Sequence, residues 1–448
     1  MSIYKDCDIR GVYPTEIDAG DARRIGRALA ALHPGVRMCV GGDVRLSTPE
    51  LKAAFIDGLV TGGVHVEDLG TIPTPALYFA LAQGGADGGA TVTASHNPPQ
   101  YNGIKFMFGG VPPTRADIDA VQAAAEGGVL PEGAGRVTAR DILPEYLASL
   151  ERRFRAKKPL RVVVDAGNGA MSRVAPEAFR RCGYEVVELF CEPDGAFPGR
   201  DPNPAEYAHL TAVCGKVRAA RADFGVAFDG DGDRAVFIDE TGAAVQNERS
   251  LSLFIRRALR DHPTPVVYDQ KSSSAVKRTI LAMGGTAVPE RSGHAFIKKR
   301  FLELGAAMAG EVSGHFFFGE LGYDDGLFAG LMMADIVARA GRPLSELAGE
   351  IALPPITPDL RVRCPYAEQQ RWLDRIEEAA KLQPCTISRL DGVRLEFTDG
   401  WVLARKSVTA EQLTLRAEAD TEERLRELLQ LIAGVLPEAA RETILPRK

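Results

Sequence analysis

Residues 224–234 read FGVAFDGDGDR, an apolar run followed by three aspartates at alternate positions and an arginine. An uninterrupted apolar run is typical of a parallel strand that is buried on both faces. The carboxylates of Asp229, Asp231 and Asp233 are separated by glycines that permit a tight turn, so they can surround one hard cation. With only Arg234 to oppose three negative charges, the turn needs a divalent ion or an equivalent. The segment predicts a buried strand that ends in a metal-binding loop.

The same arrangement, an apolar strand followed by a polar loop with small residues, occurs twice more. A strand over 90–92 leads into Thr93-Ala94-Ser95-His96-Asn97-Pro98, and a strand around 306–309 leads into Gly310-Glu311-Val312-Ser313-Gly314-His315. Ligands of open α/β sheets bind beyond the carboxyl ends of the strands, so we expect the three loops to converge on one site. There, the Ser95 hydroxyl could act as a nucleophile or carry a phosphoryl group. Glu311, Ser313 and His315 suit a polyhydroxylated ligand.

Helical and strand-like segments alternate along most of the chain, and the pattern restarts near residues 142 and 246. In the second unit it predicts a strand over 162–164, a helix over 170–182 and a strand over 186–189. Such alternation with short turns indicates α/β layers. After a proline-rich linker at 354–358, short strands over 393–397, 401–404 and 413–417 precede a helix with an apolar stripe. The predicted domains are therefore three α/β units, 1–141, 142–245 and 246–355, and one α+β unit, 356–448.

Composition narrows the class of protein. The chain has 448 residues, of which 45% are hydrophobic and 25% charged, as in an ordinary globular protein. No segment resembles a membrane span or a signal peptide, so we expect a cytoplasmic protein with no membrane partner. The net charge of −6, without a long basic tract, gives no reason to expect nucleic acid as a partner. Seven scattered cysteines without a C-x-x-C pair predict free thiols.

Other interpretations of the aspartate loop stay open at this level. Glu240 completes an EF-hand spacing counted from Asp229, but Arg234 stands where that loop needs glycine and the flanks read as strands. A haloacid dehalogenase-like phosphatase would use Asp229 as its nucleophile, although Asp233 departs from its usual pattern. A sugar-phosphate or Ca²⁺-binding protein without catalytic activity is a third possibility.

A fourth loop adds a cationic site. Arg405-Lys406-Ser407-Val408-Thr409 places two cations and two hydroxyls within five residues, which suits a phosphate group.

Taken in order, the serine, aspartate and Glu311–His315 loops resemble the signature of the α-D-phosphohexomutases, most of all the bacterial phosphomannomutase/phosphoglucomutase branch. The resemblance covers nearly the whole chain. It includes residues 4–11, 43–45, 101–105, 168–170, 193–195 and 292–294. The last loop departs from the family pattern, because Val408 replaces a small or amide residue and Ala410-Glu411-Gln412 replaces Glu-Pro.

The resemblance implies a fold and a set of roles. The α/β domains have mixed sheets, and the four domains form a heart-shaped molecule with one loop from each in a central cleft. Ser95 becomes the phosphoserine and, with Asp229, Asp231 and Asp233, holds one Mg²⁺. The resemblance further implies that Glu311 and Ser313 bind sugar hydroxyls, and that the phosphate that is not transferred is held by Arg405, Ser407 and Thr409. Further cleft residues are Arg10, Lys105, Arg234, Lys271, His294 and His315. Of these, the candidates for general acid and base are Lys105, His294 and Arg10.

The implied activity is reversible phosphoryl transfer between the 1- and 6-positions of a hexose phosphate, through a hexose 1,6-bisphosphate. The expected partners are small hexose phosphates, and the expected oligomeric state is a monomer or weak dimer. Mannose and glucose phosphates are favoured over glucosamine phosphate, the alternative substrate, because the glucosamine branch usually has Gln where Val312 stands.

Overall fold

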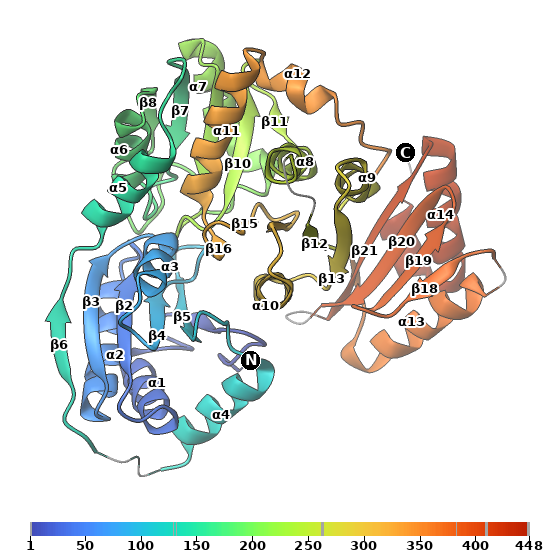
Figure 1. Cartoon of the computed structure of the whole chain (residues 1–448). Helices are drawn as coiled ribbons and strands as arrows, with labels where there is room; N and C mark the ends of the chain where they lie inside the picture. The colour runs from blue at the N-terminus through green and yellow to red at the C-terminus, as the bar shows by residue number, and fades with distance from the viewer. Residues whose placement is uncertain are drawn as a thin grey trace.

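The computed structural model describes residues 2–128, 130, 132–260, 264–381, 383–407 and 411–445. Four sheets follow one another along the chain and are arranged around an arc, with the fourth at its end (Figure 1). The predicted domain boundaries after residues 141, 245 and 355 stay predictions.

The first sheet contains six strands. They are β1 (Ile9–Val12), β2 (Arg37–Gly42), β3 (His65–Thr71), β4 (Gly88–Val92), β5 (Tyr101–Phe108) and β6 (Arg136–Ala139), with helices α1 (Ala19–Leu32), α2 (Thr48–Thr61), α3 (Thr74–Ala82) and α4 (Arg115–Glu126). The strand order is β1-β5-β4-β2-β3-β6. β4, β2, β3 and β6 pair in parallel, whereas β5 pairs antiparallel with both β4 and β1. Helices α1, α2 and α4 share one apolar cluster with the sheet, and α3 belongs to another.

The second and third sheets repeat a shorter version of this plan. The second has β7 (Arg161–Asp165), β8 (Glu185–Leu189), β9 (Phe224–Phe228), β10 (Ala235–Asp239) and β11 (Ala244–Val245), with α5 (Leu143–Arg153), α6 (Val174–Arg181), the short 3₁₀ helix η1 (Tyr207–Leu210) and α7 (Thr211–Ala220). The third has β12 (Pro265–Asp269), β13 (Thr286–Glu290), β14 (Met308–Gly310), β15 (Phe316–Phe318) and β16 (Tyr323–Asp324), with α8 (Asn247–Ala258), α9 (Ser274–Ala282), α10 (His294–Leu304), α11 (Gly326–Ala340) and α12 (Leu344–Gly349). Each combines three strands that pair in parallel with antiparallel strands at one edge.

The fourth sheet is antiparallel throughout, in the order β17-β21-β20-β19-β18. Its elements are β17 (Leu360–Arg363), β18 (Thr386–Ser388), β19 (Val393–Phe397), β20 (Gly400–Lys406) and β21 (Gln412–Ala419), with α13 (Tyr366–Ala380), α14 (Glu422–Val435) and α15 (Glu438–Ile444). On α14, the predicted stripe is the packed face, since Leu425, Leu428 and Ile432 are buried. Three mixed α/β sheets followed by an α+β unit confirm the predicted fold class.

Apolar packing joins the first three units and leaves the fourth separate. One large cluster includes α3 and α5, the second and third sheets, and α11, which packs against β9 and β10 of the second sheet. The fourth unit has an apolar cluster of its own. Burial is the main favourable term in folding, so the first three units stabilise one another directly.

Two further expectations concern single features. All seven cysteines are free thiols, as their spacing predicts. Within the described part of the chain, no helix has both the length and the apolar character that a membrane span requires.

Candidate active site

The serine and aspartate loops, 134 residues apart in the chain, touch each other. Ser95 follows β4, Asp229 follows β9, and the Ser95 Oγ donates a hydrogen bond of 2.9 Å to Asp229 Oδ2. Both residues are buried. The meeting depends on a close approach of the two backbones, because a Cβ at Gly230 would lie 2.5 Å from the Ser95 carbonyl oxygen. The carboxyl ends of two strands therefore bring the predicted hydroxyl and carboxylate into direct contact.

A lysine and a threonine of the first unit strengthen this junction. Lys105, on β5, donates 2.9 Å hydrogen bonds to Asp231 Oδ2 and to Asp233 Oδ2. Thr74, the first residue of α3, donates to Asp231 twice, from its backbone N–H at 2.9 Å and from its hydroxyl at 2.7 Å. With the Ser95–Asp229 contact, all three aspartates thus have partners from the serine-bearing unit.

The third loop closes on the aspartates from the other side. The backbone N–H of Ala235 donates to the Gly314 carbonyl at 3.1 Å, which ties the aspartate loop to the Glu311–His315 loop. His315 Nε2 lies 3.2 Å from Asp233 Oδ1, and its Nδ1 lies 2.8 Å from Glu311 Oε2. Ser313 Oγ donates to Glu311 Oε2 at 3.0 Å. The three predicted loops therefore converge.

Charge is unevenly distributed over the site. Burial and the charges of Asp233 and Asp231 raise the pKa of Asp229 well above its usual range. Burial opposes ionisation of Asp233 too, but Lys105 and His315 hold its pKa well below the ordinary value. Burial disfavours the charged imidazole of His315, yet Asp233 and its other partners raise its pKa to about 9. A carboxylate that resists ionisation beside two others indicates surplus negative charge.

The residues present fit a divalent cation. One carboxylate oxygen from each of Asp229, Asp231 and Asp233 lies within 4.8 Å of the others. Asp231 Oδ1 is buried and accepts no hydrogen bond among the described residues, so it has an unused ligand position. Carboxylate oxygens are the donors that Mg²⁺ prefers. These three side chains could hold such an ion.

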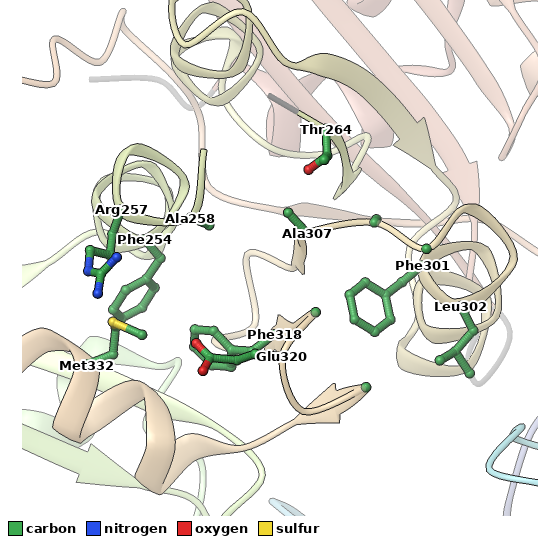
Figure 2. A pocket seen from close by; sticks show the side chains of 14 residues that line it. Phe254, Arg257, Ala258, Thr264, Phe301, Leu302, Ala307, Phe318, Glu320 and Met332 are labelled. Atoms are coloured by element: carbon green, nitrogen blue, oxygen red, sulfur yellow. The ribbon is translucent and has the colours of Figure 1, made fainter. Parts of the chain in front are cut away.

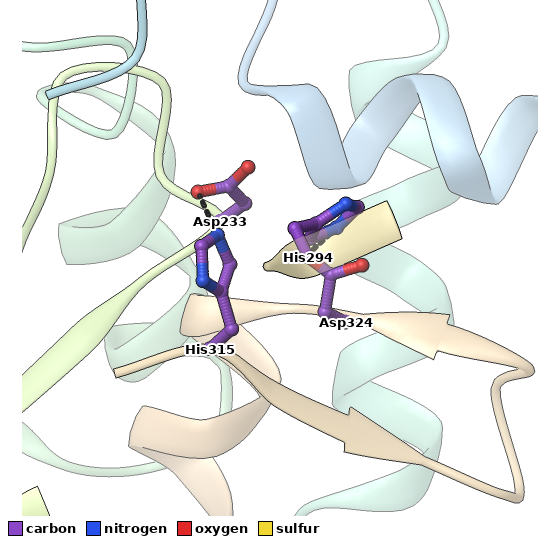
Figure 3. Close-up of side chains that lie close together, drawn as sticks. All are labelled: Asp233, His294, His315 and Asp324. Carbon is purple, nitrogen blue, oxygen red and sulfur yellow. Dashed lines mark hydrogen bonds and ion pairs between the residues drawn. The ribbon is translucent and has the colours of Figure 1, made fainter. Parts of the chain in front are cut away.

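A second cluster, which we call the histidine–aspartate cluster, consists of Asp233, His294, His315 and Asp324 (Figure 3). His294 begins α10, and its Nε2 lies 2.8 Å from Asp324 Oδ2 at the end of β16. The four side chains form two polar pairs, Asp233 with His315 and His294 with Asp324. Each imidazole is therefore oriented by a fully buried carboxylate.

Lys298 lies next to Asp324 of this cluster. Its Nζ is 3.9 Å from Asp324 Oδ1 and 3.7 Å from the centroid of the Tyr78 ring on α3. Burial lowers the pKa of Lys298 to about 8, although Asp324 opposes the shift. A cation over an aromatic face is favourable when desolvated, so this contact ties the His294 segment to the first unit.

Two further predicted cations, Arg10 and Arg234, lie beside the three loops. Arg10, on β1, donates to Asn97 Oδ1 at 2.7 Å and pairs with Asp8 at 2.5 Å. Arg234 Nε lies 3.4 Å from His315 Nε2 and 3.8 Å from Asp229 Oδ2. Both line a cavity of about 300 Å³ that also reaches Ser95, Lys105 and His294.

The fourth unit contributes Arg405 to the cleft, and the third unit contributes Lys271. Arg405, on β20, pairs with Asp391 at 2.8 Å and lines the same cavity and a larger one of about 1090 Å³. Lys271, which pairs with Asp359 at 3.0 Å, lines the larger cavity with Glu311 and Ser313. Ser407 follows β20, and its backbone N–H donates to Gln412. Thr409 lies outside the described residues.

Another cavity, of about 440 Å³, lies within the third unit between α8 and α10 (Figure 2). Its lining is mostly apolar and includes Phe254, Phe301 and Phe318. None of the predicted site residues lines it, so it is separate from the cleft.

Several polar residues of the site are not among the predicted site residues, although Arg416 is the next arginine after the fourth loop and stands later than the family pattern has it. Asp324, Lys298 and Arg416 are examples. Arg416 lines the larger cavity and pairs with Glu248 at 2.8 Å. Asp324 follows an apolar–aromatic stretch, which is a signal of the kind that identified the aspartate loop, but a single carboxylate there is too weak to single out.

Comparison with known families agrees with this geometry. Four family models match the chain in succession, described as phosphoglucomutase/phosphomannomutase alpha/beta/alpha domain I over residues 1–129, domain II over 144–242, domain III over 246–353, and C-terminal domain over 360–435.

Individual relatives match over nearly their full length. The phosphomannomutase/phosphoglucomutase of Pseudomonas aeruginosa is 37% identical over 435 residues, which is 95% of this chain and 94% of the relative. A phosphoglucomutase of Neisseria meningitidis serogroup B is 37% identical over 444 residues, covering 97% and 96%. A crystal structure of a phosphoglucomutase/phosphomannomutase family protein from Burkholderia thailandensis superposes with a TM-score of 0.90 at 34% identity, covering 100% of this chain and 98% of that one.

Proposed function

This chain belongs to the phosphoglucomutase/phosphomannomutase family, and on that premise we propose that it transfers a phosphoryl group reversibly between the 1- and 6-positions of glucose and mannose phosphates. The enzyme is thus an isomerase of the phosphohexomutase type. The observation that carries the proposal is the 2.9 Å contact between Ser95 Oγ and Asp229, beside a cleft that the third and fourth units line.

Ser95 is the group that gives and takes the phosphoryl. In the first step a sugar hydroxyl oxygen attacks the phosphorus of phospho-Ser95, the bond from phosphorus to the serine Oγ breaks, and the hydroxyl proton passes to a base. The product is a hexose 1,6-bisphosphate. After it turns over in the cleft, the Ser95 Oγ attacks its other phosphorus, and the leaving sugar oxygen takes a proton back.

The other residues of the cleft position the substrate and balance charge. Arg10 and Arg234 neutralise the phosphoryl oxygens in transfer, and Glu311 and Ser313 accept and donate hydrogen bonds to sugar hydroxyls, with Lys271 and His315 beside them. Arg405, Ser407 and Thr409 hold the phosphate that is not being transferred. Such a site is needed in both orientations of the bisphosphate.

The proton acceptor is one of Lys105, His294 and Arg10, and the structure favours His294. Asp324 holds the Nε2 of His294, which leaves Nδ1 as the acceptor nitrogen. The ammonium of Lys105 instead faces two carboxylates, Asp231 and Asp233, and a raised pKa keeps it protonated.

Asp229, Asp231 and Asp233, with the phosphate on Ser95, would hold one Mg²⁺. Such an ion supplies positive charge against the phosphoryl group. We further propose that the chain is a monomer or weak dimer and acts in the cytoplasm, where its hexose phosphate substrates are found.

Substitution of Ser95 tests the proposal most directly. Ser95→Ala removes the hydroxyl oxygen that carries the phosphoryl, so we expect loss of conversion of glucose 1-phosphate to glucose 6-phosphate. We also expect loss of an acid-stable phosphate seen by intact mass in the native protein. Ser149→Ala, a substitution on α5, serves as the matched control and should retain both. Full mutase activity in Ser95→Ala would contradict the proposal.

Removal of the cation tests the metal assignment. Chelation with EDTA should abolish turnover, and Mg²⁺ should restore it. Mg²⁺ should also raise the melting temperature of the native protein but not that of Asp231→Asn, because a bound ion stabilises only a folded site. Undiminished turnover after exhaustive chelation would count against it.

The alternatives are less well supported. Both Asp229 oxygens already accept hydrogen bonds, Oδ2 from Ser95 and Oδ1 from the Gly232 N–H, so Asp229 is poorly placed as a phosphatase nucleophile. Glu240, the residue that an EF-hand would need, binds Ser345 instead. Comparing kcat/KM for the 1-phosphates of mannose, glucose and glucosamine decides the preferred sugar.

A further inference from the structure

The proposed function assigns no role to Arg45, yet its side chain contacts the backbone of the serine loop. Arg45, in the turn between β2 and α2, is fully buried, and its guanidinium donates to five acceptors. Its Nε donates to Asp43 Oδ2 at 3.0 Å. The other four acceptors are backbone carbonyls of one segment: those of Ser95 (2.7 Å), Asn97 (2.6 Å), Pro98 (2.7 Å) and Tyr101 (3.0 Å).

Asp43 links the same arginine to the amide of Ser95. Asp43 Oδ2 accepts a 2.7 Å hydrogen bond from the Thr93 hydroxyl, and the Thr93 oxygen accepts a 2.8 Å bond from the Ser95 N–H. The N–H and the C=O of Ser95 are thus both held by the Arg45–Asp43 pair, one directly and one through Thr93. Ser95 needs this support, because its φ of 51° lies in the left-handed region that a serine rarely adopts.

The second unit packs against this support. A Cβ at Gly195 would lie 2.4 Å from the Val44 carbonyl, and the Phe197 ring lies 5.0 Å from the Arg45 guanidinium carbon. The residues that hold Ser95 therefore also meet the unit that bears Asp229.

The aspartate loop has a counterpart of the same design. Arg200 is buried, its Nε donates to Asp165 Oδ2 at 2.8 Å, and its Nη2 donates to the Phe228 carbonyl at 2.6 Å. Asp165 is the last residue of β7 and Asp43 directly follows β2; each of these strands lies next to the strand that leads into a site loop. Each loop thus rests on its own buried arginine–aspartate pair.

We propose that Arg45, with Asp43 and Thr93, is a positioning residue for the phosphoryl transfer: it holds the Ser95 backbone so that Oγ meets Asp229 and the incoming phosphoryl group. This inference rests on the proposed function. Arginine suits the task because its planar fork binds several carbonyls at once, whereas a lysine ammonium has only three N–H donors. A misplaced serine is phosphorylated slowly even where substrate still binds.

The test measures the rate of Ser95 phosphorylation by hexose 1,6-bisphosphate in a single turnover, alongside steady-state kcat and KM. Arg45→Lys should lower the phosphorylation rate and kcat by about tenfold or more while KM for glucose 1-phosphate stays within about twofold. Arg161→Lys, at an exposed arginine that pairs with Glu185, is the matched control and should behave as the native enzyme.

Two substitutions of Thr93 change the support of Ser95 with less change in side-chain size than Arg45→Lys. Thr93→Val removes both hydroxyl contacts at nearly constant shape and should show the same selective loss, while Thr93→Ser keeps them and should restore the native rate. Native phosphorylation rates in folded Arg45→Lys and Thr93→Val would overturn the inference. So would equal loss in Thr93→Ser and Thr93→Val, or failure of both Arg45→Lys and Thr93→Val to fold, since the support would then be purely structural.

The phosphorylation state of the native enzyme distinguishes failure of the proposed function from failure of the role of Arg45. If the native enzyme carries no phosphate on Ser95, the proposed function fails. If the native enzyme is phosphorylated and the variants match it, only the positioning role of Arg45 fails.

Discussion

His294 shows how one buried carboxylate can determine the chemistry of a neighbouring side chain. Asp324 has no exposed surface, and its 2.8 Å contact with Nε2 fixes both the ring orientation and the nitrogen that remains available to substrate. Lys298 and Tyr78 support Asp324 in turn, so the position of His294 depends on packing between the first and third units.

Replacing Asp324 tests this dependence. Asp324→Asn keeps the size of the side chain but no longer favours a proton on Nε2, so we expect kcat to fall by about tenfold to a hundredfold with little change in KM. The measurement is steady-state conversion of glucose 1-phosphate. Asp335→Asn, at a buried aspartate that pairs with Arg339, is the control. An unchanged kcat in Asp324→Asn would show that His294 needs no such partner.

The roles of Asp324 and Arg45 could not be found from the sequence, although residues 43–45 are among the stretches that resemble the family. Ser95 and the three aspartates stand directly after apolar strands, and that position identified them. Asp324 and Arg45 act through partners 30 and about 50 residues away, namely His294 and the carbonyls of the serine loop. Which distant group a side chain meets depends on tertiary packing.

At the scale of the helix, the start of α11 contains a carboxyl group that titrates near neutrality. Asp325 caps α11 by accepting the Phe328 N–H at 2.9 Å, and it accepts the Tyr146 hydroxyl at 2.9 Å. Burial raises the pKa of Asp325 to about 7. A raised pKa means that the folded protein prefers the neutral carboxyl, so this contribution to stability is complete at acid pH and is lost as pH rises through about 7.

We therefore expect a pH-dependent difference between the native protein and Asp325→Asn. The amide cannot ionise; its oxygen can accept the Phe328 N–H, and its NH2 can donate to the Tyr146 hydroxyl oxygen. The melting temperature of the native protein should fall relative to that of the variant mainly as pH rises from about 4, the pKa of an unfolded Asp, to about 7, and the difference should then level off. Calorimetry at several pH values measures this. Parallel curves would mean that Asp325 stays ionised in the folded state.

Some elements were predicted to the residue, and others began later than predicted. The strands over 224–228 and 393–397 agree residue for residue with β9 and β19. The helix predicted over 170–182 begins only at Val174. The preceding loop turns instead, with Asn168 at a φ of 61°, because Gly169 approaches the Gly230 carbonyl so closely that a Cβ would lie 2.7 Å from it. That approach is a tertiary contact that propensity cannot show.

In the whole molecule, the fourth unit is joined to the rest by polar contacts. Lys271 pairs with Asp359, Arg416 pairs with Glu248, and the Ser274 N–H donates to the Glu418 carboxylate. Polar interfaces between domains commonly permit relative motion. The cleft beside these contacts, at about 1090 Å³, exceeds the ~300–1,000 Å³ typical of pockets that enclose small ligands.

Binding of substrate should therefore draw the fourth unit inward. We expect glucose 1,6-bisphosphate to reduce the radius of gyration measured by small-angle X-ray scattering, because Arg405 must approach one phosphate while Ser95 faces the other. Glucose without phosphate is the control and should leave the radius unchanged. A bound bisphosphate that produces no compaction would show that the cleft is already closed.

The apolar cluster that runs through the first three units has an evolutionary consequence. Because α11 leaves its own sheet to cover strands of the preceding one, neither unit can be exchanged for a homologue's copy without creating mismatched surfaces. Among the described residues, the C-terminal unit has an apolar cluster of its own and shares none with the other three units. Chimeras that swap the whole predicted unit, residues 356–448, should fold, because its apolar cluster, α15 included, is then exchanged intact, and new substrate preferences should arise most readily by change in this unit.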